Sequence, residues 1–348
     1  MIYLCKIKPK GPLLVNENRA AIIHSDTIFG LLINKSVQLF GEKAVTPLTK
    51  GDKPPFFNSS VFPFYKDILF LPRPLRPPTL IKQQANDMVI KRSLNEIKFL
   101  SPDNFFKFLE DKEEAEKREG STLIGRGGRD MMAKDKIMVK RDKEEKGLHI
   151  KPEMIFDHLL VTREERNELE REGVKTLFYK SSLARVKPYP AYELRFNPNI
   201  DGGLYFFIQI NLDSGVKQVM GAVRLLQDEG LGGGRSTGGG AFELLSLEEY
   251  KGDLFNHSSK RGFVTLSLYH PREGEVKSGV LEGGAYQLVT RGGFIGITGL
   301  RKKRIRLFSE GSCFRNSEMF KGQILDLTPE GFTEYRVYQH GMAFKLEF

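Results

Sequence analysis

The stretch that decides the fold opens with Leu204-Tyr-Phe-Phe-Ile-Gln-Ile-Asn-Leu212, an apolar run that predicts a buried strand. A helix is predicted next, with Asp213 or Ser214 as its N-cap, because apolar side chains recur along one helical face: Val216, Val219, Met220, Val223 and Leu226. Gly230 stands where a glycine often ends a helix, and residues 241–247 predict a second strand. The stretch is therefore a strand, a helix, a glycine-rich loop and a strand.

The loop reads Gly230-Leu-Gly-Gly-Gly-Arg-Ser-Thr-Gly-Gly-Gly240, with seven glycines in eleven residues. Backbone N–H groups beside an arginine suit a phosphate or an RNA backbone. The loop lacks the lysine of a Walker-type loop and the spacing of the dinucleotide fingerprint, and both of those motifs follow a strand rather than a helix. A mononucleotide site is disfavoured on these grounds. An RNA contact is the favoured interpretation, and a flexible surface connection is the alternative.

The N-terminal part repeats the same order of elements. Residues 2–8 predict a strand, and a helix begins near His24 with Ser25 or Asp26 as its cap. The apolar face of this helix precedes Gly41 and consists of Phe29, Leu32, Ile33, Val37 and Phe40. Two halves that each open strand–helix–strand suggest a duplicated ferredoxin-like plan.

Charge and composition narrow the class of partner. The formal net charge is +10 and the isoelectric point is near 9.3, which favours an anionic partner, with nucleic acid first and an acidic membrane surface second. No apolar run approaches the roughly 20 residues of a membrane-spanning helix, so we expect no membrane association. Two isolated cysteines provide neither a disulfide framework nor a zinc site, and we expect a reducing cytoplasm.

The composition changes between about residues 76 and 175. Charged residues fill nine of ten positions over 110–119, and aromatic residues are sparse after Phe108, so this segment cannot supply much of a core. We predict an insertion that projects from the first domain as a charged, partly mobile finger, with solvated surface helices at 110–119 and 163–172. Arg126 and Arg129 lie on a glycine-flexible stretch that would suit a finger in contact with RNA.

A basic run, Arg301-Lys-Lys-Arg-Ile-Arg306, has five cations in six residues and no acid. A basic strand edge of this kind is a good surface for phosphates. Lysine at a sheet edge also prevents unwanted strand pairing, so an ordinary edge strand is the alternative.

The sequence contains no convincing active site. None of the six histidines lies at metal-binding spacing with another, and no hydrolase or metalloprotease motif is present. His24, at a helix start, is the one histidine in a suggestive setting, as a general base toward an RNA 2′-hydroxyl. We favour a structural role for His24, and we expect His340 to be packed or exposed without function.

Ordered pieces along nearly the whole chain resemble a known family. They are His24-Ser-Asp-Thr-Ile-Phe-Gly30, Ser59-Ser-Val-Phe-Pro-Phe64 with Leu71-Pro-Arg-Pro74, the glycine loop with Phe242, Gly292-Gly-Phe-Ile with the basic run and Glu310-Gly-Ser-Cys-Phe314, and His340-Gly-Met-Ala-Phe344. Together they resemble the RAMP proteins of type III-A CRISPR effector complexes, and among these the Csm-type subunit that caps the 5′ end of the guide RNA.

The resemblance implies an α+β protein of two ferredoxin-like (RRM-like) RAMP domains. The change of composition places them at residues 1–175, with the insertion at about 76–175, and at residues 176–348. It implies a non-catalytic subunit without cofactor or metal that holds the repeat-derived 5′ tag of the guide RNA. The implied partners are the guide RNA, the target RNA through the guide duplex, the large polymerase-like subunit and a backbone RAMP subunit.

Two other functions remain as alternatives: a guide-processing RAMP endoribonuclease that uses His24, and a general RNA-binding accessory protein. The predicted RNA-binding residues are His24, Ser25, Ser59, Ser60, Arg126, Arg129, Gly232, Gly233, Gly234, Arg235, Ser236, Gly238, Arg301, Lys302, Lys303 and Arg304.

Overall fold

The structure is a computed structural model of the 348-residue chain. It describes residues 1–16, 22–44, 54–76, 97–109, 153–154, 159–160, 171–173, 177–182, 191–211, 213–232, 239–256, 261–295, 300–315 and 319–348.

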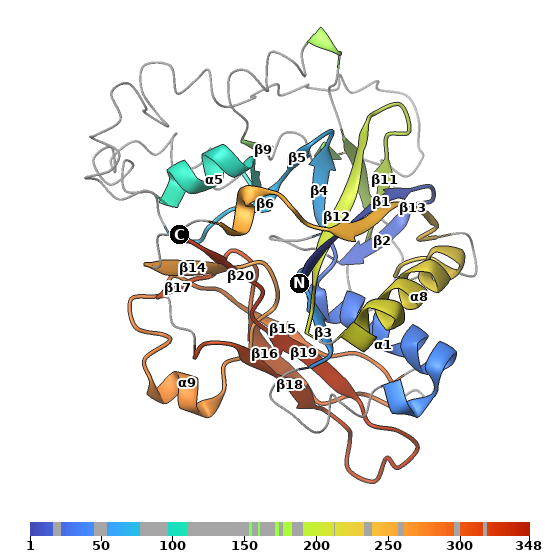
Figure 1. Cartoon of the computed structure of the whole chain (residues 1–348), viewed down its shortest axis with the longest axis vertical. Helices are drawn as coiled ribbons and strands as arrows, with labels where there is room; N and C mark the ends of the chain where they lie inside the picture. The colour runs from blue at the N-terminus through green and yellow to red at the C-terminus, as the bar shows by residue number, and fades with distance from the viewer. Residues whose placement is uncertain are drawn as a thin grey trace.

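The main sheet is antiparallel, and its strands lie in the order β13–β1–β12–β4–β5, with β3 also paired to β12. Helices α1 and α8 lie beside each other on one side of this sheet (Figure 1). The chain order β1–α1–β4–β12–α8–β13 and the central strand order are those of one ferredoxin-like fold. The elements are β1 (Ile2–Pro9), α1 (Ser25–Phe40), β3 (Phe56–Asn58), β4 (Phe62–Tyr65), β5 (Ile68–Leu69), β12 (Gly202–Ile210), α8 (Asp213–Glu229) and β13 (Phe242–Glu249).

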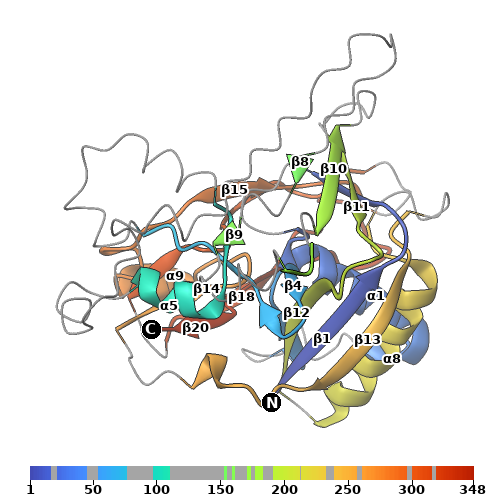
Figure 2. The same cartoon turned by 90° about the horizontal axis from the view of Figure 1, so that it is seen from above.

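The two predicted strand–helix–strand units are therefore the two halves of a single sheet, which Figure 2 shows from above. Cys5 of β1 pairs with Phe206 of β12 on one side and with Leu247 of β13 on the other. The boundary predicted between residues 175 and 176 thus falls inside this fold. The change of composition before that boundary accompanies the long connection between β5 and β12.

Strand β12 is the centre of the core, as its apolar sequence predicts. Every residue from Gly202 to Ile208 is buried, so side chains on both faces of the strand are covered. The Phe207 ring stacks on Phe344 at a centroid distance of 5.9 Å and meets Phe255 edge-on at 5.0 Å. The C-terminal segment therefore packs directly on one face of the main sheet.

Helix α1 begins one residue earlier than predicted. Its N-cap is His24, which has an extended backbone and makes no side-chain capping bond. Ser25 and Asp26 lie inside the helix, and their side chains bond to the C-terminal part of the chain instead. At the other end Gly41 (φ +71°) donates its N–H to Val37 O, as expected for a helix end, while Phe40 is 49% exposed rather than packed.

A buried lysine joins the two helices. Lys35 of α1 is only 4% exposed, and its Nζ donates to Gln38 Oε1 at 2.9 Å and to the Glu229 carboxylate of α8. Since a buried ammonium is costly unless it is paired, this contact fixes the relative position of α1 and α8.

The first described part of the predicted insertion does contribute to the core. Ile97, Phe99, Leu100, Phe105 and Phe108 are all buried in the same apolar cluster as β12. The expectation that the whole segment adds little core is thus wrong for residues 97–109, which precede the charged run. The other strands before β12, and the short helix α5, are β2 (Leu13–Asn16), β6 (Leu71–Pro72), β7 (Phe99–Leu100), α5 (Pro102–Leu109), β8 (Glu153–Met154), β9 (Leu159–Leu160), β10 (Phe178–Ser182) and β11 (Ala191–Phe196).

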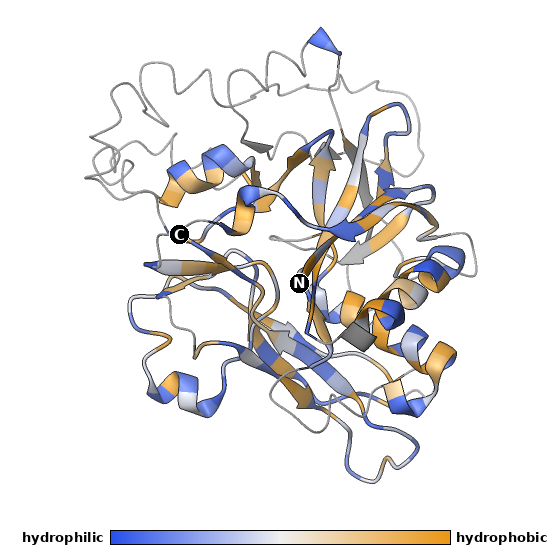
Figure 3. Cartoon of the chain, viewed as in Figure 1, coloured by the Kyte–Doolittle hydropathy of each residue, from blue (hydrophilic) through white to orange (hydrophobic). Residues whose placement is uncertain are grey.

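The described residues after β13 form one three-stranded sheet, β17–β14–β20, and two hairpins, β15–β16 and β18–β19. Figure 3 shows apolar residues in orange along the strands of the main sheet and along α1 and α8. A second ferredoxin-like domain is not confirmed by this arrangement. The elements are β14 (Gly262–Thr265), α9 (Glu273–Lys277), β15 (Leu288–Arg291), β16 (Ile305–Phe308), β17 (Cys313–Arg315), β18 (Gly322–Asp326), β19 (Tyr338–Met342) and β20 (Lys345–Glu347).

Candidate RNA interface

The glycine-rich loop follows α8, and the backbone geometry where its two ends meet requires glycine. Gly230 (φ +85°) donates its N–H to Leu226 O at 2.8 Å and ends the helix as predicted. Leu231 N–H then donates to Gly240 O at 2.8 Å, which closes the base of the loop. At Gly240 φ is +76°, and a Cβ there would lie 1.8 Å from Leu231 O, so no other residue fits without a shift of the backbone.

Most of the predicted loop contacts cannot be placed. Gly232 is described and has φ +76°. The other predicted residues of this loop lie outside the described residues; they are Gly233, Gly234, Arg235, Ser236 and Gly238. Arg126 and Arg129 of the predicted finger lie outside the described residues as well. Their contact with RNA stays a prediction.

The predicted basic run lies on the β15–β16 hairpin. Arg301, Lys303 and Arg304 are exposed. These residues precede the strand rather than form it, because β16 begins only at Ile305. Beyond the end of the opposite strand β15, Gly293 has φ +140°, and Phe294 and Arg301 pair through an isolated bridge.

Lys302 differs from its three basic neighbours because its side chain turns inward. Its Nζ donates to Gln339 Oε1 of β19 at 2.6 Å. Burial lowers the pKa of Lys302 below its ordinary value. The hairpin therefore presents three of the four predicted cations to solvent, and the fourth anchors it.

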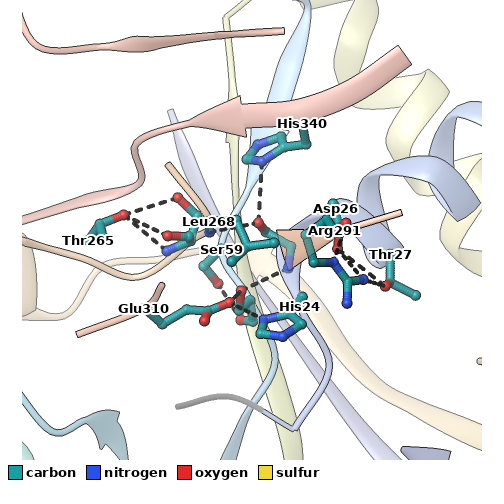
Figure 4. A network of polar contacts seen from close by, with 12 residues as sticks. His24, Asp26, Thr27, Ser59, Thr265, Leu268, Arg291, Glu310 and His340 are labelled. Carbon is teal, nitrogen blue, oxygen red and sulfur yellow. Dashed lines mark hydrogen bonds and ion pairs between the residues drawn. The ribbon is translucent and has the colours of Figure 1, made fainter. Parts of the chain in front are cut away.

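A cluster of buried polar side chains lies where the N-terminal helix meets the C-terminal part; we call it the polar junction (Figure 4). His24 Nδ1 lies 2.8 Å from Glu310 Oε1, and the Ser60 hydroxyl donates to the same carboxylate oxygen. Ser60 Oγ also accepts the N–H of Ser25 at 2.8 Å. The members of the polar junction are His24, Ser25, Asp26, Ser60, Arg291, Glu310, Gln339 and His340.

An ion pair in the polar junction holds the basic hairpin against α1. Arg291 of β15 donates to Asp26 through both Nε and Nη2, at 2.8 Å and 3.0 Å. Gln339 Nε2 donates to the same carboxylate at 2.7 Å, and Gln339 in turn accepts the bond from Lys302. This bidentate geometry is the strong form of an arginine–carboxylate contact.

The charges of the polar junction are set by burial and by these contacts. Burial by itself would raise the pKa of Asp26, but the Arg291 guanidinium holds that pKa well below its usual range. Burial would likewise raise the pKa of Glu310, and the contacts with His24 and Ser60 lower it instead. Burial lowers the pKa of His340 to about 4, although the Asp26 carboxylate opposes this shift. Both carboxylates are therefore ionised near neutral pH, and His340 is neutral.

Four of the predicted RNA-binding residues are inside the protein. His24 is 5% exposed, and Ser25, Ser59 and Ser60 are fully buried. Ser59 accepts the N–H of Phe207 at 2.8 Å and so binds the loop after β3 to the main sheet. In this structure these side chains have no surface to offer RNA, because the C-terminal part covers the start of α1, a long-range contact that local sequence patterns do not report.

The same burial bears on catalysis. His24 is 5% exposed and its Nδ1 contacts the buried Glu310, so little of the imidazole is accessible to the 2′-hydroxyl of an RNA strand in this structure. In the part of the chain that the structure describes, His, Cys, Asp and Glu side chains form no group that could hold a metal ion.

Local sequence patterns do not indicate the partners in the polar junction. Asp26 was considered only as a cap, while Arg291, Glu310 and Gln339 were not singled out as functional residues. Among these partners only Glu310 has a local sequence signal, because it is an acid that closely follows the apolar end of strand β16. In the structure Glu310 is fully buried. His340 was expected to be packed or exposed, and it is packed: its ring lies 5.1 Å from that of Phe29.

Comparison with known proteins gives the family context. Residues 258–348 match the family model of the CRISPR Csm4 C-terminal domain. The chain is 25% identical over 369 residues to the CRISPR system Cms protein Csm4 of Methanocaldococcus jannaschii, across 95% of this chain and 92% of that protein. It is 26% identical over 353 residues to the Csm4 protein of Thermococcus onnurineus, across 98% and 94% of the two chains.

A chain in a crystal structure of the Csm3–Csm4 subcomplex of a type III-A CRISPR-Cas interference complex has the same fold, with a TM-score of 0.66 at 20% identity over 100% of this chain and 99% of that one. No helix among the described residues is both long and apolar enough to span a membrane. The predicted resemblance is thus confirmed as a similarity: the chain is similar to CRISPR Csm4 proteins over 95% or more of its length, and its residues 258–348 match the model of the Csm4 C-terminal domain.

Proposed function

We propose that this chain is a non-catalytic RNA-binding subunit of a type III-A CRISPR effector complex and that it holds the repeat-derived 5′ tag of the guide RNA. The similarity to Csm4 proteins supports the membership in such a complex. The binding of the tag is our inference from the surface of the chain.

The observation that carries the proposal is the basic hairpin. Arg301, Lys303 and Arg304 are exposed, and no acid occurs in the sequence from Arg291 to Arg306. Exposed cations attract the RNA backbone, and the counterions that they release make the affinity depend on salt. The Arg291–Asp26 ion pair supports this role, because it holds the cations on a fixed base.

The glycine-rich loop is the second part of the proposed site. Its base is closed by the Leu231–Gly240 contact, so its two ends start from a defined position. Arg235 and the backbone N–H groups around it are of the type that binds phosphates. We propose that the loop contacts the tag, whereas the basic hairpin supplies the electrostatic part of the affinity.

The proposal includes no catalytic step. The burial of His24 against Glu310 disfavours the alternative of a guide-processing ribonuclease that uses this histidine. A general RNA-binding accessory protein differs from a tag-binding subunit in one measurable way, because it would bind RNA regardless of its 5′ end.

The proposed partners follow from the relatives. Structures similar to this chain are described as a Csm3–Csm4 subcomplex and as a Csm1–Csm4 cassette, the latter with a TM-score of 0.56 at 20% identity. We propose that this chain likewise contacts a backbone RAMP subunit and the large subunit, and that it meets target RNA through the guide duplex.

Both Cys5 and Cys313 are free and buried, which suits a reducing cytoplasm.

The test is the salt dependence of binding to a tagged guide RNA. Replacement of Arg301, Lys303 and Arg304 by alanine should reduce the slope of log K against log salt by about two units, since each lost phosphate contact on a single strand is worth roughly 0.7. Lys302 is left in place, because it anchors the hairpin.

The matched control replaces three exposed cations elsewhere, Lys217 and Arg224 of α8 and Lys251, and changes the net charge equally. An equal change of slope in both variants would mean that the protein attracts RNA only through its net charge. An unchanged slope in the hairpin variant, with the fold intact, would place the RNA elsewhere.

A further inference from the structure

The basic hairpin carries an exposed aromatic ring that neither the core nor the polar junction uses. Phe294 is 56% exposed, the largest exposed fraction among the exposed aromatic residues of the described chain. It lies beyond the end of β15, opposite Arg301. Two backbone bonds hold it there: Ile295 N–H donates to Leu300 O at 2.8 Å, and Lys302 N–H donates to Gly293 O at 3.0 Å.

Arg301 extends over this ring. The carbon of its guanidinium group lies 5.2 Å from the centroid of Phe294, within the range of a cation–π contact. The ring stays more than half exposed in spite of this contact. The exposed ring and the guanidinium beside it together present a flat aromatic face and a cation to solvent.

The glycines before Phe294 bring the basic side chains close to it. A Cβ at Gly292 would lie 3.2 Å from Arg304 Cγ, and one at Gly293 would lie 3.7 Å from Lys302 Cε. The stems of these cations therefore lie across the backbone of the glycine pair. Two exposed cations therefore lie along this part of the chain, Arg301 opposite Phe294 and Arg304 beside Gly292.

This surface is also held firmly. Arg291, three residues before Phe294, is fixed to Asp26 by the two bonds of 2.8 Å and 3.0 Å, and Lys302 is fixed to Gln339. A rigid aromatic platform loses little conformational freedom when a ligand stacks on it.

The chemistry of the surface selects among possible ligands. A protein-binding hot spot is an aromatic anchor surrounded by apolar, water-excluding contacts, whereas cations surround Phe294. Exposed aromatic rings beside arginine in a positively charged groove are typical of single-stranded RNA binding, because each base offers a face for stacking and each nucleotide a phosphate. Charge complementarity therefore favours an unpaired stretch of RNA.

We propose that Phe294 stacks on one unpaired base of the guide RNA while Arg301 and Arg304 contact the phosphates beside that base. The inference rests on the proposed function of the hairpin and adds to it a base-stacking residue that supplies affinity without a charge.

The two kinds of contact predict different responses to salt, and this separates the inference from the proposed function. Phe294→Ala should weaken binding of the tagged guide roughly 5- to 100-fold, the range of one base–aromatic stack. It should leave the slope of log K against log salt unchanged, because no phosphate contact is lost. The triple alanine variant of Arg301, Lys303 and Arg304 should change that slope.

Two further substitutions identify stacking. Phe294→Tyr keeps the aromatic ring and should bind within about twofold of the wild type, while Phe294→Leu keeps apolar area without a ring and should lose most of what Phe294→Ala loses. The matched control is Tyr335→Ala, which removes another exposed aromatic residue, 48% exposed, and should bind as the wild type does.

The experiment uses the full chain and tagged guide RNAs in which 2-aminopurine replaces one base at a time, with circular dichroism to check that each variant folds. We expect quenched fluorescence at one position with the wild type and Phe294→Tyr, and the loss of that quenching with Phe294→Ala. Wild-type affinity in Phe294→Ala, or full affinity in Phe294→Leu, would overturn the stacking. Failure of the triple variant to change the slope would instead overturn the proposed function of the hairpin.

Discussion

Acidification should destabilise this protein through His340. The ring is fully buried beside Phe29, and its Nδ1 lies 3.3 Å from Ser25 Oγ. Burial lowers its pKa to about 4, against an ordinary value of 6.5. Between pH 6.5 and 4 the unfolded chain therefore binds a proton at this position and the folded chain does not. The free energy of unfolding must then decrease as the pH falls through this window.

The size of the effect follows from the two pKa values. A difference of about 2.5 units corresponds to about 3 kcal/mol when the pH lies below both values. Between pH 7.5 and 5.5 the expected loss is about 1.3 kcal/mol, since at pH 5.5 only the unfolded state has taken up the proton. The folded-state pKa values of Asp26 and Glu310 are lowered, so the stability that these carboxylates contribute is lost only as the pH falls below their ordinary pKa values of 3.8 and 4.5.

The assay is urea unfolding followed by circular dichroism at pH 7.5 and 5.5, because the chain has no tryptophan for fluorescence. His340→Asn should lose about 1.3 kcal/mol less than the wild type between the two pH values, whatever its absolute stability. His270 is the control: it is partly buried, its pKa is also lowered, and His270→Asn should remove a smaller part of the pH dependence. An identical pH dependence in the wild type and His340→Asn would refute the reasoning.

Two further predictions concern the contacts that support the proposed site. Asp26→Ala leaves the guanidinium of Arg291 without its buried partner and should lower the free energy of unfolding by about 3 kcal/mol or more, with a parallel loss of RNA affinity. Stability and affinity equal to those of the wild type would show that the ion pair does not anchor the hairpin. Gly240→Ala should destabilise because its Cβ meets Leu231 O, whereas Gly30→Ala, in the open middle of α1 with nothing within 4 Å, should stabilise by about 0.5–1 kcal/mol in thermal or urea unfolding. Equal effects of the two glycine substitutions would contradict the described base of the loop.

The elements that the sequence predicts well are those with a strong local pattern. Strand β12, helix α8 and strand β13 occur where the apolar runs and Gly230 indicate them. Helix α1 is also present, although its first turn is one residue off, because Ser25 and Asp26 are ordinary capping residues and bond elsewhere. Local periodicity reports which face of an element is apolar, and it was sufficient for these elements.

The pairing of the strands was harder to predict from the sequence than the strands themselves. A strand–helix–strand unit has the same sequence pattern whether it begins a new sheet or completes an existing one. Only the pairing of β1 with both β12 and β13 makes the two units one ferredoxin-like fold, and those partners are about 200 residues or more from β1 along the chain.

The polar junction could not be predicted for a related reason. Asp26 and Arg291 are 265 residues apart, and Ser25 and His340 are 315 residues apart. Ser59 and Ser60 are expected to face RNA only from the family resemblance of the stretch that contains them. Their burial becomes evident only when the C-terminal part is placed over α1.

The central claim, that this chain holds the 5′ tag of a guide RNA, is tested most directly by the affinity of the full chain for two RNAs. They have equal length and differ only in whether the repeat-derived tag is present at the 5′ end. We predict tighter binding of the tagged RNA, and a larger loss for the tagged than for the untagged RNA when Arg235→Ala and Gly233→Val are combined. Equal affinity for the two RNAs at each salt concentration would contradict the claim and leave a general RNA-binding protein.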